Sequence, residues 1–433
     1  MLGRAMNRSI YILSALLLIL TSCGRSPLDT NEIKKNTSRI INGAALLRLD
    51  STCKNFVDSG LVAGISALIY EKNEEVYYNA YGFADQEAGI PMSRNTIVLI
   101  YSMTKPLTGT ALMTLYEEGL FRLDDPVSQY APEFADLEVY TGVDSDGNLQ
   151  VESLQRPISI RDLTRHTAGF INRAEIPGLS PLLEQLDVRN PSNTLEVMAR
   201  KLTSIPLWFQ PGAQWEYGLC VDMQAYIIER ISGKSFDKYL QEHVLDPLGM
   251  SETRYFVPES DRKRLAASYH LSDGHLSRVP DEEALSFNTK HWPLTPGGFG
   301  LTSTIDDYMR FARMLVNKGT FGETQILRPE TVRLMATNHL SDSVKIRSWL
   351  PGKGQVGFGI DFAVRLRPPA SVEENNGIVG EFFWDGAAST LFWIDPVNDL
   401  AAVLFVQLFP YDQIGLHKKF RDAVYGPYTP GIE

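Results

Sequence analysis

The sequence predicts an α+β domain in which segments from both ends of the chain form one antiparallel sheet flanked by helices. Apolar, strand-like segments gather near the two ends, whereas helical periodicity and loops dominate the middle. The 433 residues are 44% hydrophobic and 21% charged, which is enough to bury a full core. The simplest packing joins the terminal hairpins and inserts a mainly helical lobe at about residues 123–296.

The first 23 residues have the pattern of a targeting segment. Arg4 and Arg8 precede an apolar run over residues 10–20, about half of the roughly 20 residues that span a bilayer. This pattern predicts a signal peptide over residues 1–22. The ending "LTSC" resembles a bacterial lipobox and predicts acylation of Cys23, although a plain signal peptide with a chance cysteine is the alternative.

We therefore expect an exported lipoprotein that is anchored to a membrane of the bacterial cell envelope through its acyl chains. The polar, aperiodic stretch over residues 23–38 is typical of a tether. The remaining residues, 39–433, form the predicted enzymatic domain. A net charge of −11 argues against nucleic acid as a partner, because phosphate binding needs a basic surface. No oligomeric state is predicted.

The N-terminal part of the domain begins with helical periodicity over residues 40–59. Two predicted strands then flank a polar turn at Glu71–Glu75, and an apolar stretch leads into a helix that we expect to stop at Gly119. Cys53 lies on the apolar stripe of the first helix. It could pair with Cys220 in an oxidising compartment, but buried free thiols are favoured.

The C-terminal part repeats this combination of helix and strands. "TSTIDDYMRFARMLVNKG" has a capping residue followed by apolar residues at helical spacing. "STLFWIDPVNDLAAVLFVQLF" contains two apolar strands on either side of a turn at Asp395–Asn398. The seven histidines show no metal-binding spacing such as H-E-x-x-H, so we predict neither a metal nor a cofactor.

The stretch "YSMTKPLTG" contains a candidate nucleophile, Ser102, three residues before Lys105. A serine hydroxyl needs a neighbouring base and donors for the developing oxyanion. If a helix opens at Ser102, both side chains share one face, and burial at a helix N-terminus lowers the pKa of the lysine. S-x-x-K also occurs at Ser51, Ser235 and Ser260, so the spacing alone equally allows a helix cap with a solvent-facing lysine.

Longer segments around this motif decide between the two interpretations. Residues 91–134, together with "YGFAD", "ISIRDLTRHTAGF" and "LDPLGMSETRY", resemble the serine β-lactamase-fold family. The resemblance runs from about Gly64 to Gln407 and is strongest to class C β-lactamases and family VIII carboxylesterases. It implies a β-lactamase or penicillin-binding-protein fold, with Ser102 as the nucleophile and Lys105 as its partner.

The resemblance also implies a catalytic tyrosine, which Tyr217 in "FQPGAQWEYGLC" would supply. Its phenol could pass the serine proton to the leaving group. The lactamase form of this motif has asparagine where Leu219 stands, so the sequence departs from lactamases and approaches the esterase branch. The alternative is a core tyrosine with a satisfied hydroxyl.

The K-T-G motif of lactamases is absent, and "WDGAAST" stands at the matching place. By resemblance to the W-x-G of the esterases, Trp384 and Gly386 would bind substrate, and the N–H groups of Ser102 and Ala387 would form the oxyanion hole. An apolar Trp384 in place of lysine favours neutral esters or amides over anionic substrates. Asp385 would add negative charge if it pointed inward. A packed hairpin tryptophan is the alternative for Trp384.

Two further segments have non-catalytic interpretations. "PGGFGLTST", residues 296–304, lacks the lysine of a phosphate loop and is expected to be a turn or a wall of the site. His166 could serve a Ser-His-Asp triad, but no G-x-S-x-G elbow occurs, and the resemblance gives this histidine a structural role.

The predicted function is a serine hydrolase that forms an acyl-enzyme at Ser102 and cleaves a small ester or amide. One alternative is a β-lactamase or D-Ala-D-Ala peptidase that acts at the cell wall. Another is a non-catalytic penicillin-binding or sensor lipoprotein.

Overall fold

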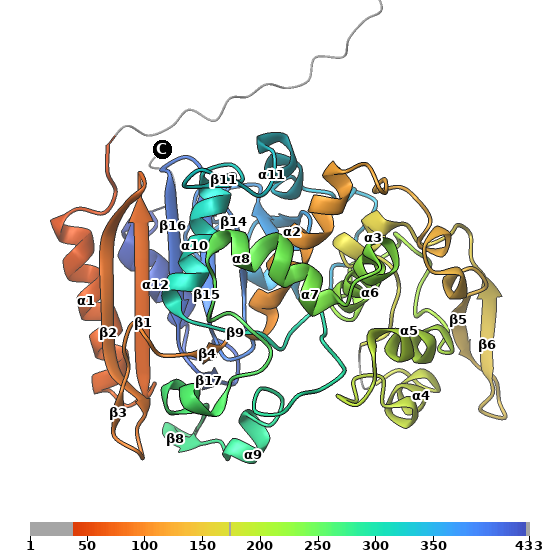
Figure 1. Ribbon diagram of the computed structural model, residues 1–433, viewed down its shortest axis with the longest axis horizontal. Helices are drawn as coiled ribbons and strands as arrows, with labels where there is room; N and C mark the ends of the chain where they lie inside the picture. Colours follow the sequence, from red (N-terminus) through yellow and green to blue (C-terminus); the bar gives the residue numbers. More distant parts are fainter. Residues whose placement is uncertain (1–37, 173–174, 430–433) are drawn as a thin grey trace, which may run out of the picture. The chain divides into compact units, whose positions relative to one another are not determined.

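The computed structural model describes residues 38–172 and 175–429, and all of them belong to one compact unit. The predicted signal peptide, Cys23 and the tether up to residue 37 lie outside the described residues. At the centre of the unit is an eight-stranded sheet with the order β12-β13-β14-β15-β16-β1-β2-β3 (Figure 1). Its strands are β1 (Gly64–Glu71), β2 (Glu74–Asp85), β3 (Ile90–Pro91), β12 (Val356–Phe358), β13 (Ala363–Arg365), β14 (Phe382–Asp385), β15 (Leu391–Asp395) and β16 (Leu400–Phe405).

An N-terminal strand and a C-terminal strand of the described residues pair in the middle of this sheet. β1 pairs antiparallel with β16, in a register that sets Ser66 opposite Phe405. β1 and β2 form the predicted hairpin, and the two turn residues, Lys72 and Asn73, both have positive φ values of 52° and 68°. This backbone matches the twist of the flanking strands. The predicted antiparallel sheet built from both chain ends is therefore confirmed.

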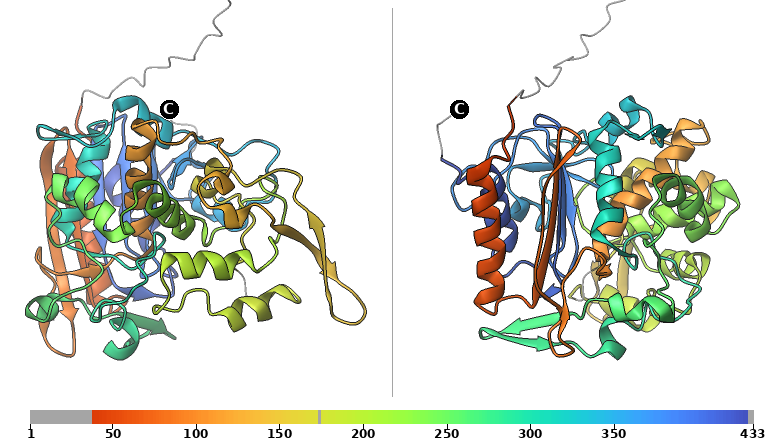
Figure 2. Two further views of the ribbon diagram at one scale, coloured as in Figure 1. Left: turned by 45° about the vertical axis from the view of Figure 1, so that its right-hand side comes forward. Right: turned by 60° about the vertical axis from the view of Figure 1, so that its left-hand side comes forward.

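Helices cover both faces of the sheet (Figure 2). α1 (Gly43–Asp58) and α12 (Leu416–Tyr425) pack together on one face, and α10 (Ile305–Val316) packs on β1, β15 and β16 from the other. α1 starts after Asn42, whose side chain accepts hydrogen bonds from the first helical N–H groups, and α10 is capped by Thr304 as predicted. Cys53 and Cys220 are both buried and free.

α2 (Thr104–Glu117) joins the sheet to the helical part of the unit, because it packs against α6 (Cys220–Ser232). It ends just before Gly119, which has a positive φ of 74°, as the sequence predicts. Residues 123–296 also contain α3 (Ile160–Thr164), α4 (Leu179–Leu186), α5 (Leu195–Thr203), α7 (Phe236–Leu240), α8 (Asp246–Leu248), α9 (Asp281–Ala284) and the hairpins β5 (Glu138–Val143)–β6 (Leu149–Ser153) and β7 (Tyr269–Ser272)–β8 (His275–Arg278).

Within the described ranges, no helix combines the length and the apolar character that crossing a membrane requires.

Candidate active site

Ser102 lies at the junction between the sheet region and α2. It does not start the α-helix, as the sequence suggested, but occupies a single 3-10 turn, η1 (Tyr101–Met103), that runs directly into α2. Tyr101 has a φ of 45°, a left-handed conformation that is costly for a residue with a side chain. Local backbone strain therefore accompanies the presentation of Ser102.

Lys105, in the first turn of α2, is 4% exposed. Its Nζ lies 3.2 Å from Ser102 Oγ and 2.6 Å from the carbonyl oxygen of Gly298. Burial lowers the pKa of Lys105 to about 8, and the charge of Asp222 opposes this shift. A lysine with this pKa is partly neutral near pH 7, so its amine can accept the proton of Ser102.

The loop that supplies the Gly298 carbonyl is held by contacts on both sides. Gly298 N donates to Asp222 Oδ1 at 2.8 Å, and Thr108 Oγ1 donates to the Gly297 carbonyl at 2.7 Å. A Cβ on Gly297 would lie 2.3 Å from the Val221 carbonyl oxygen, so only glycine fits there. The segment 296–304, expected to be a turn or a wall of the site, thus contacts Lys105 directly.

Tyr217 completes the group from the segment that precedes α6. Its ring centroid lies 4.5 Å from Lys105 Nζ, and its hydroxyl accepts a hydrogen bond from Trp384 Nε1 at 3.4 Å. Burial raises the pKa of Tyr217 above its ordinary value, although hydrogen bonds with Ser102 and Trp384 pull it down. The polar ends of Ser102, Lys105 and Tyr217 therefore converge.

Trp384, on β14, is only 1% exposed and packs inside an aromatic cluster. Its ring centroid lies 5.4 Å from that of Tyr217 and 6.1 Å from that of Trp349, a half-exposed residue. In this structure Trp384 packs against Tyr217 and donates a hydrogen bond to its hydroxyl, and direct contact of the Trp384 ring with substrate stays a prediction. The adjacent Asp385 forms an ion pair with Lys353.

Gly386 and Ala387 form a tight turn after β14, and β14 packs against η1. Gly386 N donates to the Thr390 carbonyl at 3.0 Å. A Cβ on Gly386 would lie 2.6 Å from the Ile100 carbonyl oxygen, so glycine permits the turn to approach the segment before Ser102. The turn thus lies beside the nucleophile, as an oxyanion hole made by Ser102 and Ala387 requires.

Ala387 also borders a cavity of about 650 Å³. Its lining is mostly apolar and includes Tyr101, Phe287, Phe299 and Phe409. The cavity borders both the residue before Ser102 and the expected oxyanion donor, but Ser102, Lys105 and Tyr217 are not among its lining residues.

His166 is completely buried, and its ring centroid lies 4.8 Å from that of Tyr217. Burial holds the pKa of His166 well below its ordinary value, with a further contribution from the charge of Lys105. The imidazole is therefore neutral and packs behind the tyrosine.

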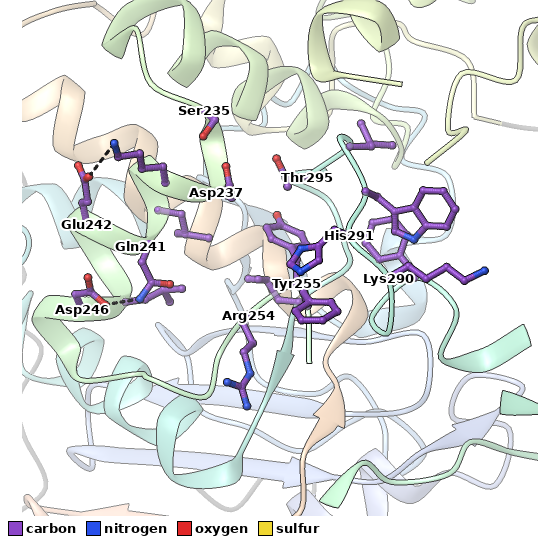
Figure 3. A pocket seen from close by; sticks show the side chains of 18 residues that line it. Ser235, Asp237, Gln241, Glu242, Asp246, Arg254, Tyr255, Lys290, His291 and Thr295 are labelled. Carbon is purple, nitrogen blue, oxygen red and sulfur yellow. Dashed lines mark hydrogen bonds and ion pairs between the residues drawn. The ribbon is translucent and has the colours of Figure 1, made fainter. Parts of the chain in front are cut away.

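Figure 3 shows a second cavity, of about 670 Å³. Phe287 and Leu301 line both cavities. The lining of the second cavity mixes charged and aromatic side chains, among them Arg254, Tyr255 and His291. Ser102, Lys105 and Tyr217 are not among its lining residues. Tyr255 Oη donates to the Pro296 carbonyl at 2.6 Å and so supports the loop that contacts Lys105.

Sequence reasoning missed three groups that shape the site: Asp222, the Gly298 carbonyl as a partner of Lys105, and Lys353. Asp222 is the third residue of α6, and a charged residue on a buried helix face could have marked it. Lys353 ends a short 3-10 turn outside the motifs, and no sequence signal marks it. Among the described residues, no group of three or more His, Cys, Asp or Glu side chains could hold a metal ion.

Comparison with known proteins gives a family match and several relatives. The Beta-lactamase family matches residues 49–425. Protein Rv1367c of Mycobacterium tuberculosis is 33% identical over 371 residues, which cover 83% of this chain and 89% of that protein. Esterase EstB of Burkholderia gladioli is 27% identical over 400 residues, covering 87% of this chain and 94% of the esterase.

Among solved structures, EstCE1, a hydrolase with promiscuous acyltransferase activity, superimposes with a TM-score of 0.72 and 26% identity. The match covers 88% of this chain and 99% of EstCE1. A β-lactamase-fold domain with these relatives is a serine hydrolase. The chain belongs to the Beta-lactamase family, and its relatives support a serine ester hydrolase built on that fold.

Proposed function

We propose that this protein hydrolyses neutral carboxylic esters through an acyl-enzyme on Ser102. The observation that carries the proposal is the distance of 3.2 Å between Ser102 Oγ and the buried amine of Lys105. A serine hydroxyl is a weak nucleophile unless a base takes its proton, and a partly neutral lysine at this distance can do so.

The shifted pKa values of Lys105 and Tyr217 assign these two side chains to different proton-transfer steps. Tyr217, with a raised pKa, keeps its phenol proton near neutral pH, whereas Lys105, with a pKa of about 8, is partly free to accept one. As Ser102 Oγ bonds to the carbonyl carbon, Lys105 takes the serine proton. Tyr217 then gives its own proton to the leaving alcohol and recovers one from Lys105.

The oxyanion that forms on the carbonyl oxygen needs donors fixed before the reaction starts. The N–H groups of Ser102 and Ala387 are proposed for this role, because the turn at Gly386 packs close to Ile100. Water then attacks the acyl-enzyme, the acid is released, and Ser102 regains its proton.

Two features favour an ester over a β-lactam or a peptide C-terminus. Trp384 replaces the lysine of K-T-G, and the nearby ammonium of Lys353 is paired with Asp385, so a substrate carboxylate would have to compete with that ion pair. The cavity beside Ala387 is mostly apolar, which suits an uncharged acyl or alcohol group. The esterase name of the relative EstB points the same way.

The first test measures hydrolysis of p-nitrophenyl acetate and butyrate by the purified protein. We expect turnover that Ser102→Ala abolishes, together with covalent labelling of the unmodified protein, but not of Ser102→Ala, by a fluorophosphonate probe. Tyr217→Phe should retain labelling while kcat falls by roughly 10²- to 10⁴-fold, the usual range for a lost general acid. Turnover that survives Ser102→Ala would overturn the proposal.

A second test separates esters from lactams. Nitrocefin and a D-Ala-D-Ala peptide should be poorer substrates than p-nitrophenyl butyrate, by kcat/KM. A higher kcat/KM for either anionic substrate would move the function to the cell-wall alternative. A stable acyl adduct without turnover, seen by intact mass, would instead indicate a binding protein.

A further inference from the structure

A buried ion pair lies directly behind the expected oxyanion turn. Lys353 is 5% exposed and Asp385 is 6% exposed, and the Lys353 ammonium contacts Asp385 Oδ2. Tyr411 Oη donates to the same carboxylate oxygen at 2.8 Å. The ammonium also lies 5.2 Å and 5.3 Å from the ring centroids of Trp349 and Trp384. Such a carboxylate is stable in the interior only because it is paired.

The position of Asp385 in the chain ties this pair to the chemistry. It is the last residue of β14, directly after Trp384 and two residues before Ala387. Lys353 comes from another segment, the 3-10 turn η6 (Leu350–Lys353). The ion pair therefore connects η6 to the end of the strand from which the oxyanion turn starts.

The negative charge of Asp385 reaches the proton-transfer groups. It raises the pKa of Lys105 and also the pKa of Tyr217. The other charged groups that act on Lys105 are Asp222 on α6 and Asp361, which raise its pKa, and Arg189, which lowers it. The charge of Asp222 also raises the pKa of Tyr217. A carboxylate that stabilises the protonated lysine and opposes a nearby oxyanion works against the proposed reaction.

We infer that Lys353 is a positioning residue that neutralises Asp385 and holds the end of β14, so that the turn at Gly386–Ala387 can stabilise an oxyanion. The inference rests on the proposed function, because it assumes that Ser102 and Lys105 react as described. It also gives a reason for an aspartate beside the nucleophile: Asp385 anchors the turn, and Lys353 removes its electrostatic penalty.

The experiment compares four variants with the unmodified protein in p-nitrophenyl butyrate hydrolysis from pH 5 to pH 10. Lys353→Met should lower kcat roughly tenfold or more with little change in KM, and should move the acid limb of the profile to higher pH. Asp385→Asn keeps a hydrogen-bond acceptor and should move that limb to lower pH. The double variant removes both charges and should return the limb to near its original position. Lys353→Arg should recover part of kcat.

Folding is followed by circular dichroism and thermal unfolding, since a purely structural ion pair would change Tm without moving the pH profile. Lys54→Met is the matched control, because it breaks an exposed lysine–aspartate pair on α1 and should leave kcat, KM and the profile unchanged. If Lys353→Met does not fold, the shift to lower pH predicted for Asp385→Asn and the return of the limb predicted for the double variant still test the inference.

An unchanged acid limb in both Lys353→Met and Asp385→Asn would overturn the inference. So would a double variant whose acid limb stays displaced as far as that of Lys353→Met alone. These outcomes differ from failure of the proposed function, which would appear as activity in Ser102→Ala. A protein in which Ser102 is essential and Lys353 has no effect on the profile keeps the function and loses the inference.

Discussion

At the residue scale, the environment of Lys105 sets the conditions for catalysis. Its amine is buried, donates hydrogen bonds to a hydroxyl and a carbonyl oxygen, and lies over an aromatic ring. Burial disfavours the charged form, and a pKa of about 8 results. At pH 7, Lys105 is therefore neutral in about a tenth of the protein molecules, which is enough for a base that acts once in each turnover.

The first prediction concerns pH. Because only neutral Lys105 can accept the proton of Ser102, kcat/KM should rise as the pH increases through about 8. Asp222→Asn removes the charge that most raises this pKa while it keeps an acceptor for Gly298 N, so the rise should move to lower pH. The pH dependence of p-nitrophenyl butyrate hydrolysis measures both. A profile that is flat between pH 6 and pH 9 would contradict the role of Lys105.

The sequence identified the site residues that belong to recognisable motifs, but not the residues that position them or shift their pKa values. Ser102, Lys105 and Tyr217 were predicted from short segments with family resemblance, and the structure brings their polar ends together. Lys353 and the Gly298 carbonyl could not be predicted, because a loop with no periodic pattern leaves its path to be decided by tertiary packing.

At the element scale, the turn after β14 depends on a close approach between two backbones. Gly386 lies so near the Ile100 carbonyl and the Thr390 hydroxyl that a Cβ would be 2.6 Å and 2.2 Å away. The hydroxyl could rotate aside, but the carbonyl belongs to the segment that presents Ser102. Any added atom therefore displaces the nucleophile, the turn, or both.

The second prediction follows from this contact. Gly386→Ala should lower kcat about 100-fold, since a shift of about 1 Å in a reacting group has that effect. Gly43→Ala at the start of α1 is the matched control, because nothing lies within 4 Å of its Cβ position, and its rate should be unchanged. Steady-state kinetics on p-nitrophenyl butyrate compare the two. Equal rates for both variants would show that the turn does not position the reaction.

Long apolar or periodic elements were predicted well, whereas the pairing of very short strands was not. α1, α10, the β1–β2 hairpin and the β15–β16 pair each cover enough residues to show a period. β4 (Val98–Leu99) and β9 (Thr302–Ser303) have two residues each, yet they pair with each other and fix the segment before Ser102. A two-residue strand has no pattern to detect, so only the packed structure reveals it.

At the scale of the whole molecule, a buried charge cluster ties the last helix to the sheet. Glu381 Oε1 accepts from Arg365 Nε on β13 at 2.8 Å and from Arg421 Nη1 on α12 at 2.9 Å. All three residues are at most 1% exposed. A carboxylate shared by two buried guanidinium groups is costly to remove, because both positive charges then stay unpaired.

The third prediction is that Glu381→Gln lowers the free energy of unfolding by about 3–5 kcal/mol. Urea denaturation measures this loss. Because Glu381 precedes the first residue of β14 whereas the turn at Gly386 follows the last one, kcat of the folded protein should change little. Glu196→Gln, which breaks an exposed pair with Arg200 on α5, should cost less than about 1 kcal/mol. A loss for Glu381→Gln no larger than for Glu196→Gln would contradict the argument.

The fourth prediction concerns the proposed lipid anchor, which lies outside the described residues. We expect the protein, expressed in a bacterium, to incorporate an alkyne-tagged fatty acid and to sediment with membranes. Cys23→Ala should abolish labelling and release the protein into the soluble fraction, whereas Cys53→Ala, which changes a buried thiol of α1, should not. Labelling that persists in Cys23→Ala would remove the lipoprotein proposal.

The pairing of β1 with β16 has a consequence for synthesis of the protein. The ribosome makes Ser102 early, but the partner strand of β1 and the turn at Gly386–Ala387 emerge nearly three hundred residues later. A growing polypeptide therefore exposes a serine with no functioning chemistry around it. The turn at Gly386–Ala387 must therefore be translated before the proposed site can form, and a polypeptide truncated ahead of this turn should be inactive.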